Sequence, residues 1–372
     1  MSLTASSPIR VAILMRPATG GMKRHVETLL HLRNRVQIHP VLFAPDDFAS
    51  LASELELPFV PFTFSPRTSP LADHRAIQSL AQLIDKKFDL LHTQGVRSLC
   101  IGAPAASRVN IPVVFTAHNL LSPLPFIPRT ALSSIMKRVE QMITVSQAIA
   151  TTYMDNGLVA KQLDIIPNGV DLSRFANSEE GHTIRQKYNI EQNAPLIVSV
   201  GRLAPEKGFD LLISAFRHLR MQMPQAHCII VGGGNEEENL RQFAWGEANL
   251  HFVGAIAEPA PFFHAANVVA IPSRLEGQGI VALEAMSAGK PVVATRIGGL
   301  VETVEDQVTG ILIPPHDPFS LSNALSILLS SPHLGLAMGK AGLQRVESRY
   351  TAERMVQRTE NLYTNILSQR GR

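Results

Sequence analysis

Two glutamates, Glu276 and Glu284, lie eight residues apart within the stretch Pro272–Gly299, and Gly279 stands between them. On an unbroken helix they would lie about 80° apart around the axis, because each residue turns the helix by ~100°. The glycines of this stretch argue against such a helix. We predict a strand that ends near Ser273, a glycine loop that carries Glu276, and a helix that begins near Gly279 and carries Glu284.

Such a loop would expose the backbone N–H groups of Gly279, Ile280 and Val281 at a helix N-terminus, where a phosphate binds well. Two carboxylates beside a phosphate site would repel the phosphate, so we expect Glu276 and Glu284 to face neutral hydroxyl groups. A ligand that combines hydroxyl groups with phosphate is a nucleotide sugar. The residues therefore suggest a nucleotide-sugar site.

Two cations occur on a second predicted strand-to-helix loop. The strand Pro195–Val200 is followed by a loop in which Gly201 and Gly208 bracket Arg202 and Lys207. Glycines allow close approach of the backbone to a ligand, and both cations pair well with phosphate. We favour phosphate binding over the alternative that the two side chains only solvate the loop.

The first half of the chain offers two further candidates. Gly20 and Gly21 follow the apolar run Ile9–Met15, which predicts a strand, a glycine loop and a helix; a plain turn is the alternative. His118 follows the predicted strand Pro112–Thr116, at the edge where open α/β sheets bind ligands. A structural histidine is the alternative there.

A third glycine run, Gly232–Gly234, excludes one class of enzyme. The dinucleotide fingerprint of dehydrogenases needs another glycine three positions after Gly234, where this chain has Glu237. The sequence also has no Asp-x-Asp metal signature. We expect no metal and no cofactor.

The length of 372 residues, with 45% hydrophobic and 17% charged residues, predicts a globular protein of two domains. Cys100 and Cys228 are far apart in apolar surroundings, which favours free thiols in a reducing cytosol. No secretion signal and no apolar run of about 18 residues occurs. These features predict a cytoplasmic protein.

Charge is distributed unevenly between the two halves. Residues 1–175 carry 17 Lys/Arg and 12 Asp/Glu, whereas residues 176–372 carry 17 and 19. The segment Leu120–Lys137 is apolar, rich in proline and basic at one end. A solvated face and a packed loop are the plain explanations; peripheral contact with an anionic membrane surface or an anionic acceptor is the alternative.

Alternating strand and helix signals predict α/β architecture with two doubly wound, Rossmann-like domains. We expect an N-terminal acceptor-binding domain at 1–175, joined by about 350–372, and a C-terminal nucleotide-sugar-binding domain at 194–349. The polar stretch 176–193 is expected to connect them. Five apolar residues recur at helical spacing, so the last helix should cross back to cover the first domain: Met355, Leu362, Tyr363, Ile366 and Leu367.

The ordered set of motifs resembles the retaining nucleotide-sugar glycosyltransferases of glycosyltransferase family four, which have the GT-B fold. The resemblance covers most of the chain and is densest in the second half. Its main motifs are IPNGVDLSRF (Ile166–Phe175), SVGRLAPEKGFDLL (Ser199–Leu212), HFVGAIAEP (His251–Pro259), EGQGIVALEAMSAGKPVVAT (Glu276–Thr295) and TGILIPPHD (Thr309–Asp317). The first half matches more loosely, through ATGGMKRHV, TAHN and ITVSQAIA.

The resemblance implies two Rossmann-like domains that face each other across a cleft, with the donor held mainly by the second. Arg202 and Lys207 would contact the diphosphate. Glu284 would bind the ribose hydroxyls, and Glu276 the transferred sugar.

The remaining implied contacts come from both domains. The amides of Gly279–Val281 would hold the distal phosphate, and backbone near Ile256 would meet the base. Gly20 and Gly21 would approach the diphosphate, and His118 would lie at the reacting centre. Gln278 stands where many members carry an aromatic residue, so its amide is expected to add a sugar contact.

The implied reaction moves a hexosyl or N-acetylhexosaminyl unit to a hydroxyl group in glycan, polysaccharide or glycolipid biosynthesis. We expect a UDP-sugar first and GDP-mannose second as donor, retention by attack from the leaving-group face, no metal and no nucleic-acid partner. Arg202, Lys207 and the helix N-terminus would stabilise the leaving diphosphate. A glycoside hydrolase, a nucleotide-sugar epimerase and a non-catalytic donor-binding subunit are the alternatives.

Overall fold

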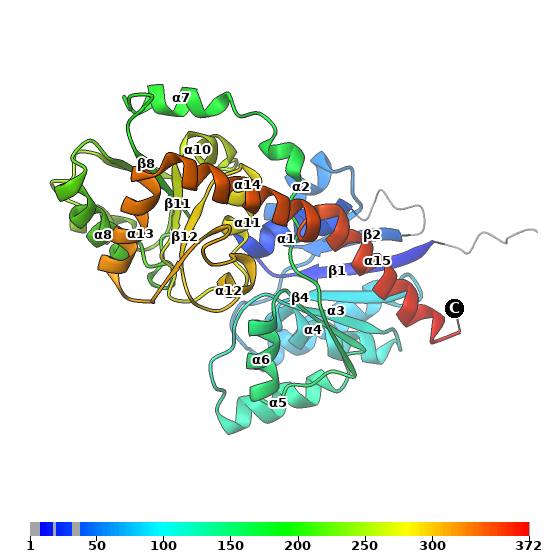
Figure 1. Cartoon of the computed structure of the whole chain (residues 1–372). Helices are drawn as coiled ribbons and strands as arrows, with labels where there is room; N and C mark the ends of the chain where they lie inside the picture. Colours follow the sequence, from blue (N-terminus) through cyan, green and yellow to red (C-terminus); the bar gives the residue numbers. More distant parts are fainter. Residues whose placement is uncertain (1–7, 18–19, 32–37, 372) are drawn as a thin grey trace, which may run out of the picture. The chain divides into compact units, whose positions relative to one another are not determined.

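The computed structural model describes residues 8–17, 20–31 and 38–371. The chain divides into two compact units. Unit 1 combines Met1–Pro167 with Glu353–Arg372, and unit 2 is Asn168–Ala352. Each unit is built on its own parallel β-sheet with helices packed against it (Figure 1). The expected pair of Rossmann-like α/β domains is thereby confirmed.

The sheet of unit 1 has seven parallel strands in the order β3-β2-β1-β4-β5-β6-β7. Its central strands, β4 and β5, are buried along their whole length, as expected of strands covered on both faces. The strands are β1 (Ile9–Met15), β2 (Ile38–Ala44), β3 (Phe59–Pro61), β4 (Leu90–Gln94), β5 (Val113–Ala117), β6 (Gln141–Thr144) and β7 (Gln162–Ile165). The helices are α1 (Gly21–Leu30), α2 (Ala49–Glu54), α3 (Pro70–Ile84), α4 (Val96–Arg108), α5 (Phe126–Met136), α6 (Gln147–Asp155) and α15 (Ala352–Ser368).

The sheet of unit 2 has six parallel strands in the order β10-β9-β8-β11-β12-β13. The strands are β8 (Leu196–Val200), β9 (His227–Val231), β10 (Leu250–Gly254), β11 (Val268–Ile271), β12 (Val292–Thr295) and β13 (Gly310–Ile313). The helices are α7 (Glu180–Lys187), α8 (Phe209–Gln222), α9 (Glu237–Phe243), α10 (Ala260–Ala265), α11 (Ile280–Ser287), α12 (Leu300–Thr303), α13 (Pro318–Ser330) and α14 (Pro332–Arg349).

Both sheets reverse their strand order once. In unit 1 the chain moves from one side of β1 to the other when it forms β4, and in unit 2 it does the same from β8 to β11. At such a reversal the loops after two neighbouring strands leave in opposite directions and open a crevice at the carboxyl edge of the sheet. The fold therefore provides one favoured ligand position in each unit.

The segment 176–193 was expected to connect the domains, but it packs within unit 2. A Cβ atom at Gly181 would lie 2.7 Å from the carbonyl carbon of His264, so α7 and α10 touch through their backbones. Arg185 is buried and donates to the carbonyls of Ala265 at 3.0 Å and Ala194 at 2.9 Å. The division between the units falls earlier, between Pro167 and Asn168.

The last helix, α15, returns to unit 1 as the spacing of its apolar residues predicted. Met355, Leu362, Tyr363 and Ile366 are buried in one hydrophobic cluster with residues of β1, β2 and β4. Figure 1 shows α15 (red) beside β1 and β2 (blue). The helix α15 is thus part of the core of the first domain.

In the part of the chain that the structure describes, no helix has both the length and the hydropathy needed to cross a bilayer.

The burial of α15 makes a prediction about stability. Leu362 is 6% exposed, so Leu362→Ala should lower the free energy of unfolding by about 2–5 kcal/mol through lost burial and the cavity left behind. Urea unfolding followed by circular dichroism measures this change. Leu336→Ala, at a 70% exposed position of α14, is the matched control and should shift stability by less than about 0.5 kcal/mol. Equal effects of the two substitutions would contradict the packing described.

Candidate functional site

Two loops of unit 2 meet at the reversal between β8 and β11. One follows β8 and ends at Gly208; the other follows β11 and begins at Pro272. Gly208 has a left-handed backbone conformation (φ 67°), and a Cβ atom there would come within 2.1 Å of the Pro272 carbonyl oxygen. The two loops therefore lie backbone against backbone at the favoured ligand position.

This contact brings together two of the predicted site residues. The Nζ atom of Lys207 donates to Oε2 of Glu276 at 2.6 Å, and the Ser273 hydroxyl donates to the same oxygen at 3.2 Å. Both side chains are partly buried, with 24% of Lys207 and 15% of Glu276 exposed. An ammonium group and an oriented carboxylate thus lie side by side, one suited to a phosphate and the other to hydroxyl groups.

Arg202, the second predicted cation, lies on the same loop but makes a different contact. Its guanidinium pairs with Glu206, one turn further along, and about half of its side chain (54%) remains exposed. The neighbouring Arg274 holds Asp210 at the start of α8 through two hydrogen bonds of 2.8 and 2.6 Å. The loop is braced by ion pairs, and Arg202 stays accessible to an anion.

The predicted helix N-terminus is present next to this pair. α11 begins at Ile280, and Gly279 precedes it with φ 90°. The amide of Ala282, the third residue of α11, donates to the carbonyl of Gly279, the residue before the helix, at 2.9 Å. The amides of Ile280 and Val281 are therefore at the open end of the helix, where a helix binds anions.

Glu284 lies on the second turn of α11 and is only 5% exposed. Arg174, which sequence reasoning missed as a site residue, places Nη1 4.0 Å from a Glu284 carboxylate oxygen. The same guanidinium donates to Glu258 through Nη2 at 3.0 and 2.9 Å. A buried carboxylate is thus accompanied by a cation, which offsets part of the cost of its burial.

The two other predicted donor-binding residues of unit 2, Gln278 and Ile256, differ in burial. Gln278 is 4% exposed, and its Oε1 accepts hydrogen bonds from the backbone N and the Nδ2 of Asn168 at 2.7 and 2.6 Å. One of the two polar atoms of the amide that was expected to contact a sugar, the oxygen, is therefore bonded inside unit 2. Ile256 lies between β10 and α10 and is 38% exposed.

In unit 1 the predicted glycines and histidine lie at the carboxyl edge of the sheet. Gly20 precedes α1 with φ 64°, and Gly21 is the first residue of that helix. His118 follows β5 directly, and its Nε2 lies 2.8 Å from Oε1 of Gln94, the last residue of β4. The His25 ring of α1 packs edge-on against the His118 ring, with centroids 4.6 Å apart.

Burial of the His118 ring, together with the nearby His25, His92 and Arg16, holds the pKa of His118 well below its usual value. Burial and the nearby His25 also lower the pKa of His92, which lies on β4, well below its usual value. These imidazoles are therefore neutral near pH 7, and they act as hydrogen-bonding groups.

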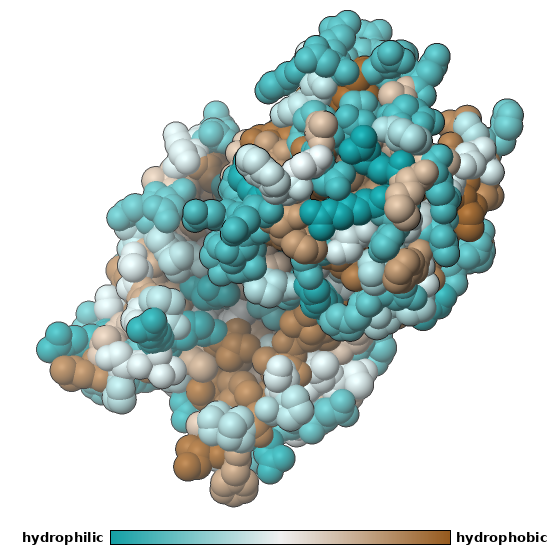
Figure 2. Space-filling model, turned by 90° about the vertical axis from the view of Figure 1, so that its left-hand side faces the viewer, coloured by the Kyte–Doolittle hydropathy of each residue, from teal (hydrophilic) through white to brown (hydrophobic). Residues whose placement is uncertain are grey.

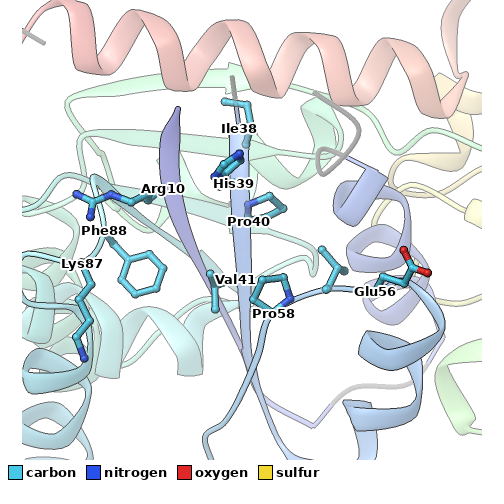
Figure 3. Close-up of a pocket in the computed structure, with 10 residues that line it drawn as sticks. Arg10, Ile38, His39, Pro40, Val41, Glu56, Pro58, Lys87 and Phe88 are labelled. Atoms are coloured by element: carbon cyan, nitrogen blue, oxygen red, sulfur yellow. The ribbon is translucent and has the colours of Figure 1, made fainter. Parts of the chain in front are cut away.

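A separate cavity of about 470 Å³ lies at the opposite, amino-terminal edge of the unit 1 sheet. Figure 3 shows Arg10, Lys87 and Phe88 on one side of it and Glu56 on the other. Residues 38–41, at the beginning of β2, also line the cavity. None of the predicted site residues lines this cavity.

Within residues 8–17, 20–31 and 38–371, no group of three or more His, Cys, Asp or Glu side chains could hold a metal ion. Cys100 and Cys228 are both free thiols.

Comparison with known proteins adds the following similarities. The family model described as Glycosyltransferase Family 4 matches residues 19–174, and the one described as Glycosyl transferases group 1 matches residues 181–345. A GDP-mannose-dependent alpha-(1-6)-phosphatidylinositol monomannoside mannosyltransferase of Mycolicibacterium smegmatis is 38% identical over 230 residues, which cover 58% of this chain and 60% of that enzyme. The corresponding monoacylated-substrate enzyme of Corynebacterium glutamicum is 30% identical over 313 residues, covering 80% of this chain and 82% of that enzyme.

Among solved structures, Anabaena HepE in complex with UDP and glucose is similar in fold and 25% identical. The similarity covers 96% of this chain and 100% of HepE, with a TM-score of 0.85.

The buried histidines make unit 1 sensitive to acid. An unfolded histidine takes up a proton near pH 6.5, but His92 and His118 resist protonation in the folded chain, so the unfolded state binds more protons below that pH. Stability should therefore fall as the pH drops below 6.5, by about 1.4 kcal/mol per pH unit for each histidine. Urea unfolding between pH 7.5 and 5.5 measures this slope.

His92→Asn should reduce the slope by the share of one histidine, whereas His333→Asn, at an exposed position of α14, should leave it unchanged. A stability that is flat over this range in the wild-type chain would contradict the prediction.

Proposed function

The chain belongs to glycosyltransferase family four, and from this premise we propose that it transfers a hexosyl or N-acetylhexosaminyl unit from a nucleoside-diphosphate sugar to a hydroxyl group of a glycan, polysaccharide or glycolipid. The observation that carries the proposal is the Lys207–Glu276 pair at the strand reversal of unit 2, next to the open end of α11. A group for the phosphate and a group for the sugar hydroxyls are adjacent there.

Leaving-group stabilisation supports this assignment chemically. When the anomeric C–O bond breaks, negative charge develops on the departing diphosphate. Lys207 has three N–H donors and gives one to Glu276, so two remain for phosphate oxygens. Arg202 and the first amides of α11 add positive potential to the same region. A diphosphate leaves without a protonating acid, so the site needs no acid and nucleophile pair of carboxylates.

We extend the proposal to the mechanism. The acceptor hydroxyl attacks from the face that the diphosphate leaves, so the configuration of the anomeric carbon is retained. The departing diphosphate takes up the proton of the acceptor hydroxyl. Lys207 and Arg202 supply the positive charge, and transfer proceeds without a divalent ion. Glu284 binds the ribose hydroxyls, while Glu276 positions the sugar.

The identity of the donor base is a separate part of the proposal. The relatives at 38% and 30% identity are GDP-mannose-dependent by name, whereas HepE, at 25% identity, holds UDP. We propose GDP-mannose as the first donor to test and UDP-glucose as the second, which reverses the order expected from the sequence. The acceptors of those relatives, phosphatidylinositol mannosides, favour a glycolipid acceptor for this chain.

Peripheral membrane contact through α5 fits a lipid-linked acceptor. Phe126 and Ile127 at the start of α5 are 70% and 77% exposed, and the Arg129 guanidinium lies 5.9 Å from the Phe126 ring centre. Lys137 and Arg138, just after α5, are also exposed. Figure 2 shows that apolar (brown) side chains reach the surface among polar (teal) ones on the face that it presents. Exposed apolar side chains with nearby cations suit an anionic lipid surface.

The donor site yields the first functional prediction. Lys207→Ala should lower kcat by about 10²–10³, because one preorganised donor to the leaving group is lost. Glu284→Ala should raise KM for the donor with the fold unchanged. The assay follows release of nucleoside diphosphate from a panel of nucleotide sugars, with candidate acceptors, in the presence and absence of a chelator.

Lys187→Ala, which removes an exposed lysine of α7 in the same unit, is the matched control and should retain full activity. Turnover like that of the wild type in both site variants would rule out this site. Product analysis separates the alternatives: a hydrolase would release free sugar from an unactivated glycoside, an epimerase would form product without acceptor, and a donor-binding subunit would bind without turnover.

The α5 surface yields a second prediction. Replacing Phe126 and Ile127 together by Ser should weaken cosedimentation with vesicles that contain phosphatidylglycerol by at least about tenfold, since two large apolar side chains no longer insert. The double replacement of Phe319 and Ile327 on α13, which are 62% and 51% exposed, is the control and should leave binding unchanged. Equal vesicle binding by both variants would contradict a docking role for α5.

A further inference from the structure

A buried chain of hydrogen bonds in unit 1 links His118 to the C-terminal helix α15. Tyr363 of α15 places its hydroxyl oxygen 2.6 Å from Nδ1 of His92, and Nε2 of His92 lies 2.7 Å from the Thr116 hydroxyl. The Gln94 amide nitrogen lies 3.2 Å from the same His92 Nε2, and the Gln94 amide oxygen lies 2.8 Å from Nε2 of His118. His92, Gln94, Thr116 and Tyr363 have no exposed surface.

The Gln94 amide decides which nitrogens carry protons along this chain. An amide oxygen only accepts and an amide NH₂ only donates, so the two imidazole nitrogens that face Gln94 must differ. In this amide orientation Nε2 of His118 carries the proton. Nε2 of His92 is bare, and the Thr116 hydroxyl and the Gln94 amide share its one lone pair. His92 then carries its proton on Nδ1 and donates it to the Tyr363 oxygen.

The same assignment leaves Nδ1 of His118 bare. Among the residues whose placement is described, none makes a hydrogen bond to this nitrogen, and His118 as a whole is half-buried at the carboxyl edge of the sheet. The edge-on contact with His25 restrains the plane of the ring. His118 therefore offers Nδ1 as one oriented hydrogen-bond acceptor to a ligand, while its Nε2 is bonded to Gln94.

The charges around the ring preserve this state. The groups that act on His118 are His25 from α1, Arg16 at the end of β1 and His92 from β4, and all three, like the burial of the ring, lower its pKa. No carboxylate is among the interactions recorded for His118 in the described parts of the chain. A protonated His118, which would lose its bare nitrogen, is disfavoured.

We propose that Gln94 is a positioning residue that holds His118 in the Nε2-protonated tautomer, so that Nδ1 accepts a hydrogen bond from a substrate hydroxyl group, and that Tyr363 of α15 anchors Gln94 through His92 of β4. The benefit to turnover rests on the proposed glycosyl transfer. The proton arrangement itself does not depend on that activity, so the two can be tested separately.

The tautomer is measured directly by NMR of the full chain labelled with ¹⁵N-histidine. Comparison with the His118→Gln spectrum assigns the His118 signals among the 13 histidines. We expect His118 with a protonated Nε2 and a bare Nδ1 at pH 7, in the absence of any substrate. In Gln94→Leu we expect a mixture of both tautomers. A wild-type His118 that carries its proton on Nδ1 would overturn the proposal, whether or not the chain proves to be a transferase.

The pH–rate profile provides the second readout. Gln94→Glu keeps the shape of the side chain but places a carboxylate beside His118, which stabilises the imidazolium form. The acid limb of kcat should move toward neutral pH by about one unit or more, with KM for the donor little changed. In Gln94→Leu kcat should fall about tenfold or more at pH 7.

Thr93→Val is the matched control, because Thr93 is equally buried on β4 but donates to the Val114 carbonyl, outside the chain of bonds. It should leave the tautomer and the pH–rate profile unchanged. An acid limb that stays at the wild-type position in Gln94→Glu would show that Gln94 does not control His118. Tyr363→Phe removes only the hydroxyl oxygen that contacts His92. Like Gln94→Leu, it should make the Nδ1-protonated tautomer of His118 more populated. An unchanged tautomer ratio would show that Tyr363 plays no part in positioning His118.

Discussion

The candidate donor site of unit 2 depends on one backbone contact, the approach of Gly208 to the carbonyl oxygen of Pro272. A Cβ atom at position 208 would lie 2.1 Å from that oxygen, much closer than atoms can pack. Any side chain there would push the loop after β8 away from the loop after β11. Lys207 lies immediately before the contact, and Ser273 and Glu276 follow just after it, so separating the loops would also separate the ion pair. The electrostatics of the site are therefore a consequence of steric contact between two loops.

The parts of this arrangement that local signals encode could be predicted from the sequence. Gly279 interrupts a helical pattern, and α11 begins at the next residue. The apolar spacing of the last helix predicted that it would be buried against the first domain, and Met355, Leu362, Tyr363 and Ile366 are buried there. Lys207 and Glu276 stand beside glycines at the ends of predicted strands, and the sheet order brings those ends together.

Other features could not be predicted, because they depend on the direction in which a side chain points. Gln278 and Asn168 are 110 residues apart, and nothing local indicates that the Gln278 oxygen turns inward to accept from Asn168. Arg174 belongs to a recognised motif, yet only the tertiary structure places it beside Glu284. The stretch 176–193 has the polar composition of a linker, although Arg185 uses its polar atoms to bind buried carbonyls of unit 2.

The position of α15 also determines the order in which the chain can complete its two cores during synthesis. All of unit 2 precedes residue 353, so its sheet can close as soon as that stretch has left the ribosome. Unit 1 begins earlier in the chain, but its hydrophobic cluster lacks four large side chains until residue 366 has emerged. Synthesis of unit 1 therefore begins before that of unit 2 but ends after it. The apolar surface of unit 1 beside β1 and β2 remains exposed to solvent while unit 2 is being synthesised. This interval is where the nascent chain is most exposed to aggregation and where a chaperone would find apolar surface to bind.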